Sequence, residues 1–226
     1  MKPISNLAAL ALTASLVAGV SFVAFAQTAP KKTEPAKAAP AKKAEKKADP
    51  ALVDAYLKNT FGKAPPEWQA RIVPDDTLKA CNAGNNDVSS KDADKIVKAE
   101  LAKVVYPADG KLVGDWKEGK KIANNGRGGQ FSDPEGTVAG GNCYACHQLE
   151  KSEVSFGTLG PSLTNYGKDR KFDAAEAKNA FTKIFDSQAV LACSNMPRFG
   201  ANKVLSEKQI TDLVALLFDP ESPVNK

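Results

Sequence analysis

Cys143, Cys146 and His147 form the pattern C-x-x-C-H, read in full as Cys-Tyr-Ala-Cys-His. Two thiols at this spacing can bond to both vinyl groups of one haem, and the pattern is typical of c-type haem attachment. Once both sulfurs are in thioether bonds, the adjacent histidine can reach only the proximal axial position of the iron. The motif therefore predicts one covalently bound haem c, with His147, the single histidine of the sequence, as an axial iron ligand.

The same residues could serve a zinc site or a thioredoxin-like redox pair. A structural zinc needs four ligands, and with one histidine these would have to include Cys81 or Cys193 at no familiar spacing. A redox C-x-x-C motif lies near a βαβ pattern, which this sequence lacks. Haem attachment is the interpretation that we favour.

Met196 is the only methionine apart from the initiator, and a low-spin electron carrier needs a second strong axial ligand. A thioether favours ferrous haem and raises its reduction potential. Pro197 and Gly200 place the methionine in a segment that cannot continue a helix and can turn tightly. A lone methionine is usually a core residue, but the need for a sixth ligand favours ligation. Cys193 is the competing ligand, and its thiolate would lower the potential.

Two further features concern the surroundings of the iron ligands. Cys81 and Cys193 are predicted to form a disulfide between the N-terminal part of the fold and the segment that carries Met196. A free Cys193 beside the haem, which would be reactive, is the alternative. The second ring nitrogen of His147 is expected to donate to a backbone carbonyl, and the Gly160-Pro161 pair is a candidate for that carbonyl.

The leading segment reads as targeting sequence followed by a tether. Residues 1–26 have an apolar run that ends in Ala24-Phe25-Ala26, which predicts a cleaved secretory signal peptide, with an uncleaved anchor as the alternative. Residues 27–50 are almost entirely Lys, Ala, Pro and Glu, which predicts a disordered spacer or an electrostatic handle for an acidic partner. We expect a periplasmic protein with no membrane association after cleavage.

The formal charge of +5 lies outside the predicted fold. The leader and the tether contribute all of the excess, and the cationic and anionic side chains of residues 51–226 balance. A nucleic-acid-binding domain would carry its cationic excess on one face of the fold itself. We therefore expect no nucleic-acid partner.

Hydrophobic periodicity and capping residues predict an all-α fold with long loops, because no stretch alternates between hairpin turns. Residues 51–112 form a predicted N-terminal helical extension and residues 113–226 the main domain. The expected helices are one from Ala51 to before Gly62, one over Lys91–Val105 capped by Ser90, one from Asp115 to Asn125, one capped by Asp173, and one with a Ser206/Gln209 capping box.

Two segments resemble class I cytochromes c. Residues 114–122 are similar to the amino-terminal helix of that family, in which a glycine, matched by Gly119, allows a close crossing with the carboxy-terminal helix. The segment Gly160-Pro161-Ser162-Leu163 is similar to the loop whose proline carbonyl holds the proximal histidine, and Pro161 matches that proline. The resemblance implies a class I cytochrome c fold.

Four segments together resemble the SoxX family, the monohaem subunits of SoxAX cytochromes: residues 106–111, 140–149, 196–200 and 217–225. This resemblance implies a heterodimer with SoxA, which bears the bond-forming site of an L-cysteine S-thiosulfotransferase and joins thiosulfate to a SoxY cysteine of the SoxYZ carrier. It implies an electron-transfer role between SoxA and a soluble cytochrome c, and no catalytic residue on this chain. The alternatives are a free-standing periplasmic shuttle and a haem catalyst with a dissociable distal ligand.

Overall fold

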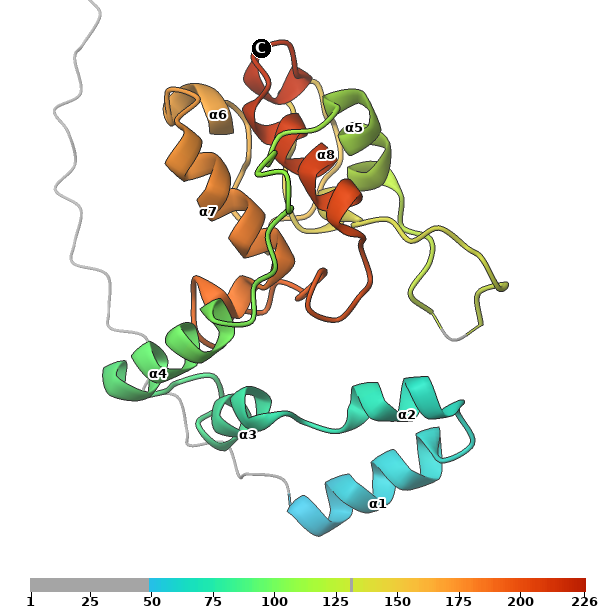
Figure 1. Cartoon of the computed structure of the whole chain (residues 1–226). Coiled ribbons are helices and arrows are strands. Elements are labelled where there is room, and N and C mark those ends of the chain that lie inside the picture. The colour runs from blue at the N-terminus through green and yellow to red at the C-terminus, as the bar shows by residue number, and fades with distance from the viewer. Residues whose placement is uncertain (1–48, 131) are drawn as a thin grey trace, which may run out of the picture. The chain divides into compact units, whose positions relative to one another are not determined.

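The computed structural model describes residues 49–226 apart from Phe131, and all of the regular structure in this range is helical (Figure 1). No strand occurs in these residues, which confirms the prediction of an all-α fold. The predicted signal peptide and residues 27–48 of the predicted tether lie outside the described residues. The elements are α1 (Pro50–Phe61), α2 (Pro66–Ile72), α3 (Asp76–Ala83), α4 (Ser90–Leu101), α5 (Trp116–Asn124), η1 (Cys143–Ala145), α6 (Tyr166–Asp169), α7 (Ala174–Phe185), η2 (Ser187–Ala189), α8 (Glu207–Phe218) and η3 (Pro223–Asn225).

Helix α1 begins one residue before the predicted extension. The Asp49 carboxylate accepts a hydrogen bond from the Ala51 N–H (2.9 Å), and Pro50 suits the first turn of a helix because it has no N–H to leave unpaired. The last two residues of the predicted tether therefore belong to the helix. Among residues 49–226, none of the helices has the length and apolarity needed to cross a bilayer.

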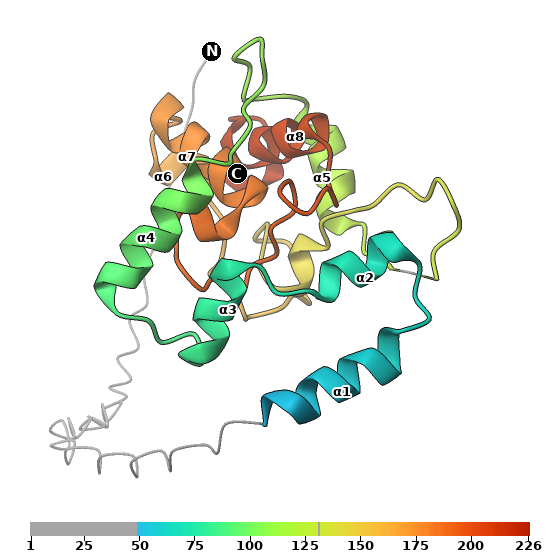
Figure 2. The ribbon, with the colours of Figure 1, turned by 60° about the horizontal axis from the view of Figure 1, so that its bottom comes forward.

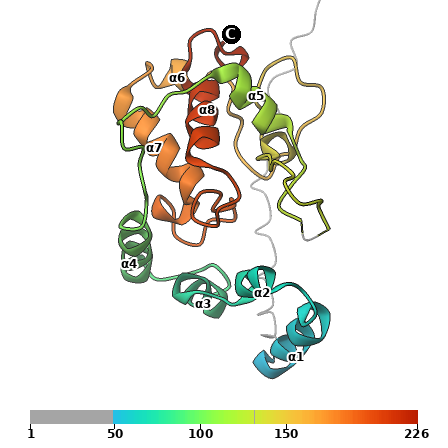
Figure 3. The same cartoon turned by 45° about the vertical axis from the view of Figure 1, so that its right-hand side comes forward.

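Helix α8 lies at the centre of the main core. Every residue from Ile210 to Phe218 is buried. The helix starts with the predicted capping box, in which the Ser206 hydroxyl accepts from the Gln209 N–H and the Gln209 side chain accepts from the Ser206 N–H. Helices α5 and α7 pack on α8 and flank it in two views of the ribbon (Figures 1 and 3).

Helices α5 and α8 cross at Gly119 with no side chain between them. A Cβ atom at Gly119 would lie 2.0 Å from the carbonyl oxygen of Asp212. The buried Asp212 carboxylate accepts a hydrogen bond from the Asp115 N–H (2.9 Å) and pairs with Lys208 (2.7 Å). The start of α5 is therefore fixed to α8 by backbone contact and by this carboxylate, as the helix-crossing role of Gly119 requires.

Helices α2 and α3 are absent from the sequence prediction. Helix α3 starts at the N-cap Asp75, whose carboxylate accepts from the Leu78 N–H (2.8 Å). Its buried residues are Thr77 and Cys81, which form no apolar stripe that periodicity could reveal. The helix depends on tertiary contacts that only the folded chain supplies.

Helix α4 departs from its prediction at both ends. Its N-cap is Ser89 and not Ser90, because the Ser89 hydroxyl accepts from the Asp92 N–H (3.2 Å). The helix ends at Leu101 and not Val105, since the N–H of Lys103 bonds to the carbonyl three residues earlier and tightens the chain out of α-helical geometry. The buried face carries Ile96 and the charged Glu100.

Replacing Gly119 by alanine is expected to destabilise the protein by about 1–3 kcal/mol, because the new Cβ forces α5 away from the α8 backbone. The free energy of unfolding of the haem-loaded protein, measured in denaturant, checks this. The exposed Lys121→Ala variant on the same helix is the control and should change that free energy by less than about 0.5 kcal/mol. Equal stabilities for the two variants would contradict the close crossing.

Candidate haem-binding site

The C-x-x-C-H motif occupies a tight turn that begins in the left-handed region. Asn142 has φ 48° and ψ 38°, and the turn of η1 follows it. The N–H groups of Cys146 and His147 both donate to the Cys143 carbonyl (3.1 and 2.9 Å). Both motif cysteines are free thiols and are half-buried. The two sulfurs and the imidazole are therefore presented by a single turn of chain.

The His147 ring is oriented by a carbonyl and enclosed by a glycine. Its Nδ1 lies 2.7 Å from the Pro161 carbonyl oxygen, which can only accept a hydrogen bond. Nδ1 therefore carries the proton, and Nε2 presents a lone pair that can bind a metal. A Cβ atom at Gly160 would lie 2.1 to 2.7 Å from the ring atoms, so only glycine leaves room for the imidazole. This arrangement fits a haem whose iron takes Nε2 as a ligand.

Burial disfavours a redox role for the Cys143 thiol. It raises the pKa of Cys143 to about 12, and the thiolate, not the thiol, is the nucleophile in disulfide exchange. The described residues also contain no strand from which the βαβ surroundings of a redox pair could be built.

Cys81 and Cys193 are bonded to each other across 112 residues of sequence, with their Cα atoms 5.4 Å apart. The bond joins α3 to the segment that leads to Met196. A Cys193 sulfur in a disulfide is not a thiolate, so the competing axial ligand is removed. The same bond takes away the cysteines that a four-ligand zinc site would need.

Met196 lies at the edge of the main core. Its side chain is half-buried and packs against the same hydrophobic cluster as Cys143. Both of its backbone polar groups are paired with serines, because its N–H donates to the Ser194 hydroxyl (3.3 Å) and its carbonyl accepts from the Ser187 hydroxyl. The thioether is the one group of this residue left to bind iron.

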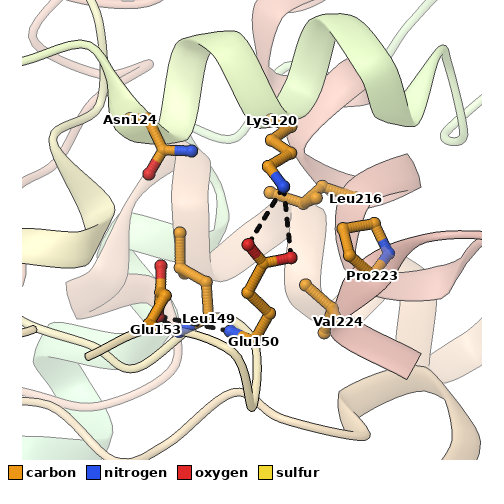
Figure 4. Close-up of a pocket in the computed structure, with 8 residues that line it drawn as sticks. All are labelled: Lys120, Asn124, Leu149, Glu150, Glu153, Leu216, Pro223 and Val224. Atoms are coloured by element: carbon orange, nitrogen blue, oxygen red, sulfur yellow. Dashed lines mark hydrogen bonds and ion pairs between the residues drawn. The ribbon is translucent and has the colours of Figure 1, made fainter. Parts of the chain in front are cut away.

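A small cavity lies between α5 and the segment that follows the motif (Figure 4). Lys120 of α5 points to Glu150 and pairs with its carboxylate at 3.0 Å. The Glu153 carboxylate accepts from the Leu149 N–H (2.6 Å). The volume of about 10 Å³ accommodates one water at most, so this cavity takes no ligand. The Lys120–Glu150 ion pair beside it attaches the segment after the motif to α5.

A buried ion cluster beside Met196 has no counterpart in the sequence prediction. Arg198 pairs with Asp75, Glu100 and Asp186, and the side chains of Glu100 and Asp186 are 0% and 1% exposed. Nothing local in the sequence signals it, since two of the partners lie 98 and 123 residues away. Removing one member of such a buried pair typically costs about 3–5 kcal/mol, because the remaining charge has no partner.

Hydrogen bonds within the cluster keep Arg198 and Glu100 charged, although burial disfavours the charged form of each side chain. Burial acts to lower the pKa of Arg198, but hydrogen bonds to Asp75 and Asp186 outweigh it and hold that pKa above its ordinary value. Burial raises the pKa of Asp186. Glu100 is also subject to burial, yet hydrogen bonds from Thr77 and Lys103 bring its pKa below the ordinary value. Arg198 is therefore the permanent cation on which the carboxylates depend.

Residues 115–218 match the family Cytochrome c, and this span contains the C-x-x-C-H turn, Met196 and both crossing helices. The chain therefore contains a cytochrome c domain, and it is an electron-transfer haem protein with covalently attached haem c in an all-α cytochrome c fold. The chain is also similar to an "Uncharacterized lipoprotein" of Aquifex aeolicus (strain VF5), with 33% identity over 180 residues, 78% of this chain and 84% of that protein. This similarity is longer than the family match, so it includes sequence outside residues 115–218.

Replacing Gly160 by alanine is expected to displace the His147 ring and leave haem attachment intact, because the thioether bonds need only the two cysteines. The ferric protein should then show increased high-spin absorption, with unchanged covalent haem on a stained denaturing gel. Ser162→Ala, a small change in the same loop, is the control and should keep the low-spin spectrum. A low-spin spectrum in Gly160→Ala equal to that of the control would contradict the enclosure of the ring.

Proposed function

We propose that this chain is the electron-transfer subunit of a SoxAX-type cytochrome, with Cys143 and Cys146 attaching the haem and His147 and Met196 as the axial ligands. The observation that carries the ligand assignment is the Cys81–Cys193 disulfide, because it leaves Met196 as the soft ligand in its segment. The bound haem supplies one-electron chemistry. His147 and Met196 would both be ligands of the iron, which would leave no site for a substrate on it.

The individual residues have separable tasks in this proposal. Pro161 fixes the tautomer and orientation of His147 and increases the basicity of Nε2. Met196 favours the ferrous state and so raises the reduction potential. The main core excludes water from the side on which Cys143 and Met196 pack. No side chain of this chain is assigned a catalytic acid, base or nucleophile role.

The SoxAX assignment is supported by the four segments that resemble the SoxX family. In this role the chain accepts electrons from SoxA while SoxA joins thiosulfate to the SoxY cysteine of SoxYZ, and it passes them to a soluble cytochrome c. The thiosulfotransferase activity thus belongs to the complex, with the bond-forming site on SoxA. A free-standing electron shuttle is the second candidate. It is favoured by the balanced charge of residues 51–226, because a domain without net charge is not matched to one partner of opposite charge.

Docking of a redox partner is supported by apolar side chains around the motif. Tyr144, Val154, Phe156 and Leu159 are all exposed, and Val154 and Leu159 are 100% and 90% accessible. Exposed apolar side chains that gather near a functional site are typical of interaction surfaces, and these four lie within 16 residues of sequence that begin in the motif. Because the fold has no net charge to steer association, such contacts would carry the affinity.

The periplasm is the proposed location. The predicted signal peptide supports export, and the relative from Aquifex aeolicus is described as a lipoprotein. The proposal is therefore an exported protein.

Replacing Met196 by alanine is expected to abolish the methionine-to-ferric-iron charge-transfer absorption and to lower the reduction potential. The absorption spectrum of the ferric protein and a potentiometric titration measure the two effects. Covalent haem on a stained gel should be unchanged, which controls for attachment. Survival of the band in this variant would show that another residue is the distal ligand.

The complex is tested by co-expression with a SoxA cytochrome from the same cell. We expect a stable heterodimer on affinity purification and gel filtration, with covalent haem on this chain. Reduction of this chain by SoxA and its reoxidation by a soluble cytochrome c should both be observable by stopped-flow absorption. A lone monomer in the presence of folded SoxA would favour the free-standing shuttle instead.

A further inference from the structure

Arg198 lies two residues after Met196, and three carboxylates converge on its guanidinium. Nη1 is 2.6 Å from Asp75 and Nη2 is 2.7 Å from Glu100. Nε donates to both oxygens of Asp186 at 3.0 and 3.1 Å. The Arg198 side chain is only 11% exposed, so these contacts are made largely out of water.

The carboxylates come from three separate elements. Asp75 caps α3, Glu100 lies in α4, and Asp186 caps η2. Thr77 of α3 donates to the Glu100 carboxylate, which joins α3 to α4. Arg198 thus ties the chain after Met196 to helices α3 and α4 of the extension and to the end of α7.

The chain before Met196 is tied to the same two helices. Cys193 is bonded to Cys81 of α3, and this disulfide packs against Ile96 of α4. Helix α4 also contacts η2, which follows α7. Figures 1 and 2 show α4 next to α3, the other helix that holds this segment. The segment 193–198 is therefore held at both of its ends by α3 and α4.

Between these two attachments the segment has no regular helix, so its flanking residues decide where the thioether lies. Ser187 adds one further tie by donating to the Met196 carbonyl. A methionine side chain with several rotatable bonds stays in one place only if its backbone does. The extension supplies that constraint from outside residues 115–218, the span that matches the family.

We propose that Arg198 is a positioning residue for the distal ligand, and that α3 and α4 serve as a buttress that holds Met196 in place. This inference rests on the proposed ligation by Met196. Arginine suits the task because its planar group offers five N–H donors to several carboxylates at once, whereas a lysine ammonium is a single point charge. Loss of the guanidinium leaves the buried Asp186 without its cation and Glu100 with Lys103 alone, and it removes the contacts that hold the segment to these carboxylates.

The test uses the full-length, haem-loaded ferric protein and imidazole as a competing ligand. Arg198→Gln should bind imidazole about tenfold more tightly than the natural protein, because the fraction of molecules with Met196 displaced increases. The charge-transfer absorption should weaken in parallel. Lys103→Gln is the matched control, since it removes a cation that pairs with the same Glu100 carboxylate (3.0 Å) but lies just beyond the end of α4 and not in the segment 193–198. Its imidazole affinity should stay near that of the natural protein.

A second variant covers the case in which Arg198→Gln yields no haem-loaded protein. Asp75→Asn keeps an N-cap residue for α3 and removes only one ion pair of Arg198. It should raise the imidazole affinity in the same direction and by a smaller factor. Removal of the disulfide in Cys81→Ser/Cys193→Ser should add to the effect, because it releases the other end of the segment.

The outcomes separate the positioning role from the ligation itself. If Arg198→Gln, or Asp75→Asn in its place, binds imidazole as Lys103→Gln does, the positioning role is overturned. If Met196→Ala keeps the charge-transfer band, the ligation is wrong and the positioning role fails with it. Tighter imidazole binding by Arg198→Gln and an unchanged Lys103→Gln support the proposal.

Discussion

The contact between α5 and α8 admits no side chain at Gly119, and the segments that carry the proposed iron ligands are both connected to these two helices. The C-x-x-C-H turn follows α5 and is tied back to it, since the Gly141 N–H donates to the Ile122 carbonyl (2.9 Å). The Met196 segment is joined to Ser206, the N-cap of α8, by the turns of residues 199–205. A change in the separation of the two helices would therefore move the two ligands relative to each other.

Local chemistry in the sequence was sufficient to predict most of the main domain. The caps Asp115, Asp173 and Ser206 each satisfy N–H groups of the first helical turn, and such bonds need only neighbouring residues. Helix α3 escaped prediction because its buried residues are a threonine and a cysteine, whose partners lie elsewhere in the chain. The choice between Ser89 and Ser90 as cap of α4 was equally beyond composition, since both residues have the right side chain.

Some residues of the candidate site could be predicted from the sequence and others could not. His147 and Met196 could be predicted as ligands because the mature chain has no other histidine or methionine. Cys143 and Cys146 could be predicted because they stand together in one short motif. Arg198 was invisible, because its role arises from three carboxylates that only the fold assembles. The extension, which reads in sequence as an appendage, holds the segment that carries the proposed distal ligand.

The Cys81–Cys193 bond also gives the chain a particular topology. It closes a covalent ring, and the C-x-x-C-H turn lies inside that ring because its residues fall between the two bonded cysteines. The Gly-rich loop between α5 and η1, which contains the exposed Val138, lies inside the same ring. A protease that cut this loop once would open the ring without separating the fragments. Both pieces, and the motif with them, would stay on one covalently connected molecule in the oxidising compartment for which the sequence is predicted to be destined.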